Sequence, residues 1–226
     1  MHVCIDVGNS AIKLGLYDQG QLVKKIIVST EAKKADEYEA SFFSLLNYHD
    51  FDPNHVDHVM FSSVVPNIDV ELIQGLQQLF KCSVIHKLSN ITKTTLVLNV
   101  KNPDEVGADL LADLVGCKAK YNVPSLIIDC GTATKILYLD KEGIFQTCLI
   151  MPGLSICSKA LTSRAALLPA VDYEKVTSIT KAKDTDQAMA NGIIYGHVAS
   201  IKGVVEQFEK ELGFKCQKVL TGGILK

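Results

Sequence analysis

The sequence predicts an α/β protein made of two similar halves. A hairpin around a glycine turn occurs twice, at residues 4–18 (CIDVGNSAIKLGLYD) and at residues 126–140 (LIIDCGTATKILYLD). Each copy opens a run of three strand-like segments, and helical segments follow each run. The length of 226 residues allows two modest domains, which we expect at residues 1–113 and 114–226 with a cleft between them.

The first half is expected to read strand, strand, strand, helix, strand, helix, strand. Gly8-Asn9 and Asp18-Gln19-Gly20 are turn signals between β-branched runs, which predicts an antiparallel meander. The expected segments are HVCIDVG, AIKLGLYD, QLVKKIIVST, a helix at 35–48, the strand HVMFSSVVP, the helix DVELIQGLQQLF and the strand CSVIHKL. In the first helix, Tyr38, Phe42, Leu45 and Leu46 share one face.

The second half repeats the opening meander after a helix at LLADLVGCKAKY. Its three strands are LIIDCG, TKILYLD and IFQTCLI, with Lys141-Glu142-Gly143 as the second turn. A helix at about 154–165 and a long helix at about 186–212 follow, the latter ending at Gly213 as a C-terminal cap. Apolar residues of the long helix, from Ile193 to Phe208, are expected on one face, and KCQKVLTGGIL closes the chain as a strand and a glycine turn.

The composition narrows the class of protein. With 47% hydrophobic and 21% charged residues the chain is expected to be globular, and a formal charge of -2 gives no field that would gather nucleic acid. No run of 18 apolar residues is present, so we expect a cytoplasmic protein without a membrane segment. The seven cysteines lack a C-x-x-C pair, which favours buried free thiols, and His55 and His58 are expected in a solvated loop rather than in a metal site.

The repeated turn has the form D-x-G followed by small polar residues. Glycine allows a phosphate close to the backbone, whose N–H groups point at its oxygens, and Asn9, Ser10 and Thr132 can add side-chain donors. The leading aspartate would repel phosphate and is expected to hold a cation. A single such turn is often only a tight hairpin, but two copies favour an anion site. A third glycine turn, Thr221-Gly222-Gly223, suits the close approach of an adenosine.

An ordered set of motifs resembles the type III pantothenate kinases, in the actin, Hsp70 and sugar-kinase superfamily. The set is DVGNS (6–10), PDEVGAD (103–109), DCGTAT (129–134), MPG (151–153), SRAALLP (163–169), KDT (183–185), AMANGIIYG (188–196) and LTGG (220–223). The resemblance implies duplicated RNase H-like (actin-like ATPase) domains, each with a mixed five-stranded sheet flanked by helices. It also implies transfer of the ATP γ-phosphate to pantothenate, with Mg2+, a monovalent cation (K+ or NH4+) and a homodimer.

The resemblance assigns the phosphate site to both turns. On the first turn it implies Asp6, Val7, Gly8, Asn9, Ser10 and Lys13, with Asp6 near Mg2+ and Lys13 near a phosphate. On the second it implies Gly131 and Thr132 at the phosphate and Asp129 at the monovalent cation, with Gly222 and Gly223 at the nucleotide. Without the motif, Lys13 reads equally well as a solvated strand lysine.

Asp109 matches the catalytic base, which orients the attacking hydroxyl and accepts its proton. The position is also that of a helix N-cap, and both readings can hold. The residues implied at pantothenate are Val100, Gly107, Ala108, Asp109, Leu110 and Thr185. Arg164 is assigned to the substrate end, against the alternative of an exposed helix arginine.

Several positions depart from the family pattern. Leu110 stands where the family usually has an arginine, and Lys135 where it has a threonine. Thr147-Cys148 replaces a glycine pair, and Val100 replaces an aromatic residue. Relatives also continue through a further helix past the position of Lys226. Loss of the arginine removes a forked cation from a site that handles anions. Two alternatives therefore stand beside the kinase: a catalytically weakened nucleotide-binding homologue with a regulatory role, and a kinase acting on another small alcohol.

Overall fold

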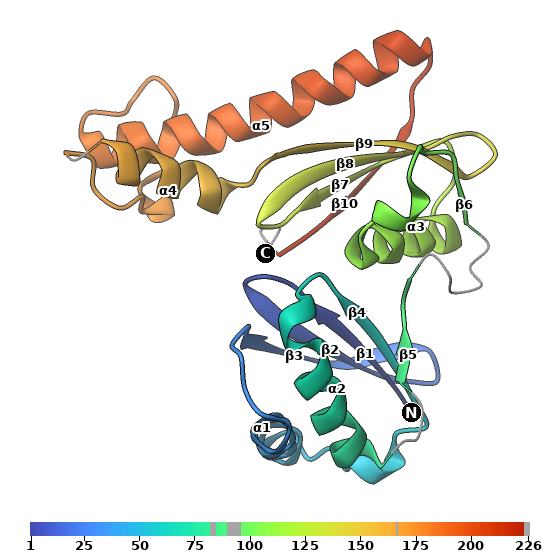
Figure 1. Ribbon diagram of the computed structural model, residues 1–226. Helices are drawn as coiled ribbons and strands as arrows, with labels where there is room; N and C mark the ends of the chain where they lie inside the picture. The colour runs from blue at the N-terminus through green and yellow to red at the C-terminus, as the bar shows by residue number, and fades with distance from the viewer. Residues whose placement is uncertain (82–84, 90–95, 166, 224–226) are drawn as a thin grey trace. The chain divides into compact units, whose positions relative to one another are not determined.

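The chain folds into two compact units in a computed structural model, which describes residues 1–81, 85–89, 96–165 and 167–223 (Figure 1). The first unit comprises Met1–Thr95 and Lys101–Val115, and the second comprises Leu96–Val100 and Gly116–Lys226. The helix α3 (Ala108–Lys120) therefore begins in one unit and ends in the other.

The first unit contains a mixed sheet of five strands in the order β3-β2-β1-β4-β5. The strands are β1 (His2–Val7), β2 (Ala11–Asp18), β3 (Gln21–Ser29), β4 (His58–Ser63) and β5 (Ile85–Lys87). The predicted meander is confirmed, because β1, β2 and β3 pair antiparallel, while β4 and β5 continue the sheet in parallel. Residues 82–84 of the predicted fifth strand lie outside the described residues.

Two helices, α1 (Ala35–Tyr48) and α2 (Pro66–Phe80), pack on this sheet. The predicted face of α1 is confirmed, since Tyr38, Phe42 and Leu46 are buried and Leu45 packs against the same core. The strand β4 ends before Val64, and α2 begins at Pro66, earlier than expected. Proline suits the first turn of a helix because its missing N–H would have no partner there.

The second unit has a mixed five-stranded sheet in the order β10-β7-β8-β9-β6. Its strands are β6 (Val97–Leu98), β7 (Ser125–Cys130), β8 (Ala133–Leu139), β9 (Ile144–Pro152) and β10 (Gln217–Thr221). The predicted meander β7-β8-β9 is confirmed, with Gly143 at positive φ in its second turn. The strand β6 was not predicted, since two residues carry no readable pattern, and it pairs parallel to β9 at the sheet edge.

The helices of the second unit are α4 (Leu154–Arg164) and α5 (Thr185–Leu212). Short 3-10 turns occur at η1 (Pro53–His55), η2 (Pro103–Glu105) and η3 (Tyr173–Lys175). The C-terminal part of α5 packs on the sheet through Val204, Val205 and Phe208. Its N-terminal part lies beside α4 and η3 (Figure 1).

The apolar face of α5 is not covered along its whole length, because Val198 is 44% exposed. The helix has 28 residues and is about 42 Å long at its usual rise, whereas the seven residues of β8 extend about 24 Å. The sheet is therefore too short to cover the whole helix.

Six cysteines in the described part of the chain form no disulfide, and Cys117, Cys130 and Cys216 are buried as expected, whereas Cys4 is exposed. Cys82 lies outside the described residues. His55 and His58 are exposed, although His58 begins β4 rather than lying in a loop. Among the described residues no group of three His, Cys, Asp or Glu side chains could hold a metal ion, and no helix there has the length and apolarity needed to span a bilayer.

Hydrogen bonds to the Glu209 side chain connect the end of α5 to β10 and the residues just before it. Its buried carboxylate accepts hydrogen bonds from Lys215 Nζ (2.7 Å), the Cys216 N–H (3.0 Å) and Lys218 Nζ. The two lysines, followed by the backbone N–H, lower the pKa of Glu209 from its ordinary value of 4.5 to about 2. The stabilisation is therefore complete above pH 4.5 and is lost as the pH falls from 4.5 towards 2.

We predict that Glu209→Gln lowers the Tm at pH 7 by roughly 5 °C, because the neutral amide leaves two lysines without their anion. The difference from the wild type should shrink as thermal unfolding is followed down to pH 3. Glu206→Gln, an exposed position on the same helix, is the control and should leave the Tm within about 1 °C. An equal loss in both variants would contradict the assignment.

Candidate functional site

The first glycine turn joins β1 to β2 and is closed by backbone contacts. The Gly8 N–H donates to the Ala11 carbonyl (3.0 Å), and Thr30 Oγ1 donates to the Gly8 carbonyl (2.6 Å). Asn9 and Ser10 are exposed at the tip. The Val7 side chain lies in the core with no exposed surface, so any contact of Val7 with a ligand falls to its backbone.

Asp6 and Lys13 form an ion pair at the base of this turn. They are directly opposite in the β1–β2 register, and Lys13 Nζ lies 2.8 Å from Asp6 Oδ2. The two side chains are 44% and 35% exposed, so both remain accessible to a ligand. Lys13 is therefore not the isolated solvated lysine that the sequence left open.

Asp109 lies in the first turn of α3, one residue inside the helix. Its Oδ1 accepts a hydrogen bond from the Leu110 N–H (2.8 Å), which orients the carboxylate. A Cβ at residue 107 would lie only 2.6 Å from this oxygen, so glycine is required for the carboxylate to occupy its place. The side chain thus bonds to a first-turn N–H, as a cap does, without occupying the N-cap position.

A chain of contacts connects Asp109 to the first turn. The Val64 N–H, directly after β4, donates to the carbonyl of Val7 at the end of β1 (3.0 Å). The Val64 Cγ1 in turn lies 3.8 Å from the Cβ position of residue 107. Since β1 and β4 are parallel neighbours, Gly107 and Asp109 lie at their carboxyl ends, the same edge of the sheet as the glycine turn.

In the second unit three motifs that are distant in sequence meet. The second turn joins β7 to β8, and the Gly131 N–H donates to the Ala133 carbonyl (3.1 Å). The Gly153 N–H, at the end of MPG, donates to the Thr132 carbonyl (3.2 Å). Thr221, before the third glycine turn, pairs with Asp129 between the parallel strands β10 and β7.

Two glycines allow these backbones to approach closely. A Cβ at residue 153 would lie 2.3 Å from the Thr132 carbonyl oxygen, and one at residue 222 would lie 2.3 Å from the Cys130 carbonyl oxygen. Gly222 also has φ +112°, which disfavours other residues. The second and third turns are therefore packed backbone against backbone.

The second turn also carries an aspartate and lysine pair. Asp129 and Lys135 are opposite in the β7–β8 register, and Lys135 Nζ lies 2.8 Å from Asp129 Oδ2. The side chains are only 14% and 13% exposed. The lysine that stands out from the family pattern is thus the counterpart of Lys13 in the other hairpin.

Thr134, beside this pair, is fully buried and shares a hydrogen bond with His197 Nε2 on α5 (3.0 Å). Burial lowers the pKa of His197 from its ordinary value, which favours the neutral imidazole. The contact ties the long helix to the second turn.

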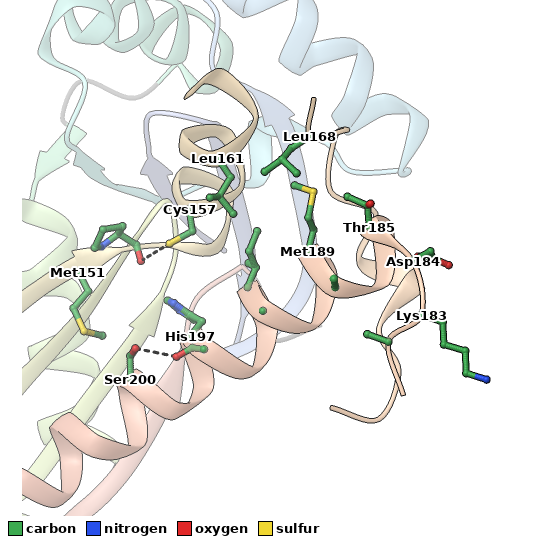
Figure 2. A pocket seen from close by; sticks show the side chains of 16 residues that line it. Met151, Cys157, Leu161, Leu168, Lys183, Asp184, Thr185, Met189, His197 and Ser200 are labelled. Carbon is green, nitrogen blue, oxygen red and sulfur yellow. Dashed lines mark hydrogen bonds between the residues drawn. The ribbon is translucent and has the colours of Figure 1, made fainter. Parts of the chain in front are cut away.

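A cavity of about 890 Å3 lies between the end of β9, α4 and the N-terminal half of α5 (Figure 2). Figure 2 shows Met151, Cys157, Leu161, Met189 and His197 on its walls and Thr185 at the first position of α5. The expected substrate contact Thr185 is therefore exposed at the edge of a largely apolar cavity.

The remaining expected residues are spread over both units. Leu110 is half-buried in the first turn of α3, and Val100 follows β6, directly after Asn99, whose N–H donates to the Phe145 carbonyl (2.9 Å). Arg164 is exposed at the last position of α4, as the simpler reading expected. The first unit thus brings together Asp6, Gly8, Lys13, Gly107 and Asp109, and the second brings together Asp129, Gly131, Thr132, Gly153 and Gly222.

Sequence reasoning missed the Asp129–Lys135 pair and the Thr134–His197 contact. The first had a signal: each lysine stands on the second strand of its hairpin, seven residues after Asp6 in one copy and six after Asp129 in the other. Aligning the hairpins by strand register would have found it. The second had none, because the two residues are 63 positions apart.

Comparisons with known proteins identify relatives over the whole chain. A family model described as type III pantothenate kinase matches residues 2–207. A type III pantothenate kinase of Exiguobacterium sp. is 37% identical over 227 residues, covering 100% of this chain and 88% of that protein. One of Citrifermentans bemidjiense is 37% identical over 225 residues, covering 99% and 88%.

Solved structures share the fold at much lower identity. The activator of the 2-hydroxyisocaproyl-CoA dehydratase from Clostridium difficile, with bound ADPNP, has a TM-score of 0.54 and 14% identity, covering 99% of this chain and 80% of that one. Component A of the (R)-2-hydroxyglutaryl-CoA dehydratase of Acidaminococcus fermentans has a TM-score of 0.53 and 14% identity, covering 99% and 83%. With the two mixed five-stranded sheets and their flanking helices, the fold is the duplicated actin-like ATPase fold expected from the sequence.

We predict that Gly222→Ala destabilises the protein by about 1–3 kcal/mol, because the added methyl group collides with the Cys130 backbone. Gly223→Ala is the control, since a Cβ there meets no atom within 4 Å. Urea unfolding of both variants measures the difference. Equal stability of the two would show that the turns are not packed as described.

Proposed function

Since the chain belongs to the type III pantothenate kinase family, we propose that it transfers the γ-phosphate of ATP to the hydroxyl group of pantothenate, the first step of coenzyme A biosynthesis. The observation that carries the mechanism is the position of Asp109 beside the first glycine turn. A carboxylate and a phosphate-binding turn at one sheet edge can serve the same transfer. The curated relatives reported above are all kinases, which favours catalysis over the regulatory alternative.

In our proposal Asp109 orients the pantothenate hydroxyl and accepts its proton. Phosphoryl transfer of this kind passes through a loose transition state, in which the hydroxyl proton leaves late, so a carboxylate of ordinary basicity is sufficient. The Leu110 N–H holds the Asp109 carboxylate in one orientation, which favours a defined approach of the hydroxyl.

The two glycine turns are proposed to bind the nucleotide phosphates. Donors would come from the exposed side chains of Asn9 and Ser10 and from the backbone N–H groups around Gly8, Gly131 and Thr132. Lys13 would supply a positive charge. Gly222 and Gly223 would approach the adenosine, which agrees with their place beside the second turn. We propose two actin-like domains. Residues 1–113 would carry the first turn, and residues 114–226 would carry the second and third turns.

Mg2+ would enter with the nucleotide. This ion keeps several water ligands and is usually bound by one or two carboxylates together with phosphate oxygens. The half-exposed carboxylate of Asp6, next to the first turn, fits that role, and the ion would neutralise phosphate charge there. A monovalent cation at Asp129 fits less well, because the ammonium group of Lys135 already contacts that carboxylate.

Pantothenate is proposed to contact Val100, Gly107, Ala108, Leu110 and Thr185 in addition to Asp109. Gly107 and Ala108 are supported by their position at the sheet edge next to Asp109, and Thr185 by its exposure at the edge of the cavity. Arg164 is proposed at the substrate end only on the strength of the motif.

A homodimer and a cytoplasmic location complete the proposal. Apolar side chains of β9, α4 and α5 are exposed, among them Ile150 (69%), Leu161 (42%) and Val198 (44%), and they offer a surface for a second copy. The six cysteines of the described part form no disulfide, which agrees with a reducing compartment.

Asp109→Asn is expected to lower kcat by about 10²–10⁴-fold, because the amide keeps the shape but cannot accept the proton. Phosphopantothenate formed from ATP, Mg2+ and pantothenate is the readout. Asp113→Asn, one turn further along α3, is the matched control and should retain turnover within about threefold. Unchanged turnover in Asp109→Asn, or an equal loss in the control, would refute the assignment of the base.

Leu110→Arg is expected to lower the KM for pantothenate by about tenfold, because a guanidinium next to Asp109 can donate charge-assisted hydrogen bonds to an anionic substrate. Leu110→Lys tests the geometry, since a point charge lacks the fork and should give a smaller gain. A KM that stays constant or rises in Leu110→Arg, with the protein folded, would argue against Leu110 at the substrate.

A further inference from the structure

The ion pairs at the two turns have the same connectivity but different surroundings. Each joins the aspartate that precedes the glycine to a lysine on the next strand, at 2.8 Å between Nζ and Oδ2. The pair Asp6–Lys13 is 44% and 35% exposed, whereas Asp129–Lys135 is 14% and 13% exposed. Water and ions thus have much less access to the second pair.

The place next to Asp129 is also the place where the family resemblance puts a monovalent cation. The Lys135 ammonium group is itself a compact cation with one charge and three N–H donors. A second monovalent ion at the same carboxylate would be repelled by this ammonium group, and the repulsion is stronger because little water surrounds the pair. K+ or NH4+ and Lys135 therefore compete for one position at this carboxylate.

We propose that Lys135 takes the place of the monovalent cation, so that the nucleotide site of this chain works without K+ or NH4+. The charge balance at Asp129 is the same with a lysine as with an ion. The lysine is held by β8 and packed opposite its partner, so its occupancy does not depend on the ion concentration in solution. The proposal rests on the kinase function, since the role of the site is part of that function.

The position of the pair explains how it can act on the nucleotide site. Asp129 lies on β7, two residues before Gly131, and pairs with Lys135 of β8 on one side. On the other side of β7, Asp129 pairs with Thr221 of β10, the residue directly before Gly222. The neutralised carboxylate is therefore at the point where the second and third turns meet. Without a cation there, an uncompensated buried negative charge would oppose a phosphate at the second turn.

The test compares the wild type with Lys135→Thr, which makes room for an ion. Pantothenate phosphorylation is measured with K+, NH4+, Na+ or tetramethylammonium as the monovalent cation, at constant ionic strength. We expect the wild-type rate to vary less than about twofold among the four cations. Lys135→Thr should be slow in tetramethylammonium and recover at least about tenfold with K+ or NH4+. Lys25→Thr, an exposed lysine on β3, should behave as the wild type.

A second readout needs no turnover. Thermal unfolding of the protein without substrates is followed as K+ replaces tetramethylammonium. An ion that binds only the folded state raises the Tm by mass action, so the Tm of Lys135→Thr should rise with K+ while that of the wild type stays constant. This measurement remains decisive even if pantothenate proves not to be the phosphoryl acceptor.

Two results would overturn the proposal. One is a wild-type enzyme that loses most of its activity without K+ or NH4+, which requires no variant and holds even if Lys135→Thr fails to fold. The other is a folded Lys135→Thr whose activity and Tm are both indifferent to the cation, which would make the pair a purely structural cross-strand contact.

Discussion

Close contact between peptide backbones holds the second unit's site together. Carbonyl oxygens of residues 130–132 lie where a Cβ of residue 153 or residue 222 would have to stand. No side chain can be accommodated at either position without displacing backbone, which cannot yield as a flexible side chain can. The three motifs that converge there are therefore one structural unit, although up to 93 residues separate them in the chain, from Cys130 to Gly223. In the nucleotide site that we propose, this packing would fix the donors of the turn before the nucleotide arrives, which reduces the ordering needed on binding.

The two hairpins show how a duplicated element can diverge while its register is kept. Both place an aspartate and a lysine opposite each other, yet the first pair is open to solvent and the second is enclosed. An open pair can exchange partners with a ligand or a hydrated ion at little cost. An enclosed pair must remain neutral as a unit, because desolvated charges are expensive when separated. The same two residue types are thus suited to binding in one hairpin and to fixed neutralisation in the other.

The sequence was sufficient for the elements whose pattern is local. Period-2 runs and glycine turns gave both meanders, and the spacing of Tyr38, Phe42 and Leu46 gave α1 and its buried face. Features that depend on distant partners were not readable in this way. The strand β6 exists because β9 offers it an edge, and Val198 is exposed because the sheet ends before the helix does. Of the candidate site, Asp109 and the turns came from motifs, whereas the role of Lys135 depended on knowing which residue faces Asp129.

The strand β6 has a consequence for the separability of the halves. Residues 96–100 belong to the second unit, but residues 101–115 belong again to the first. A single cut at the middle of the chain leaves the second unit without β6, the edge strand of its sheet. A cut before residue 96 instead leaves the first unit without residues 101–115, the segment that bears Asp109. Neither unit is a continuous stretch of polypeptide, so no uninterrupted segment of this chain contains one complete unit and nothing of the other.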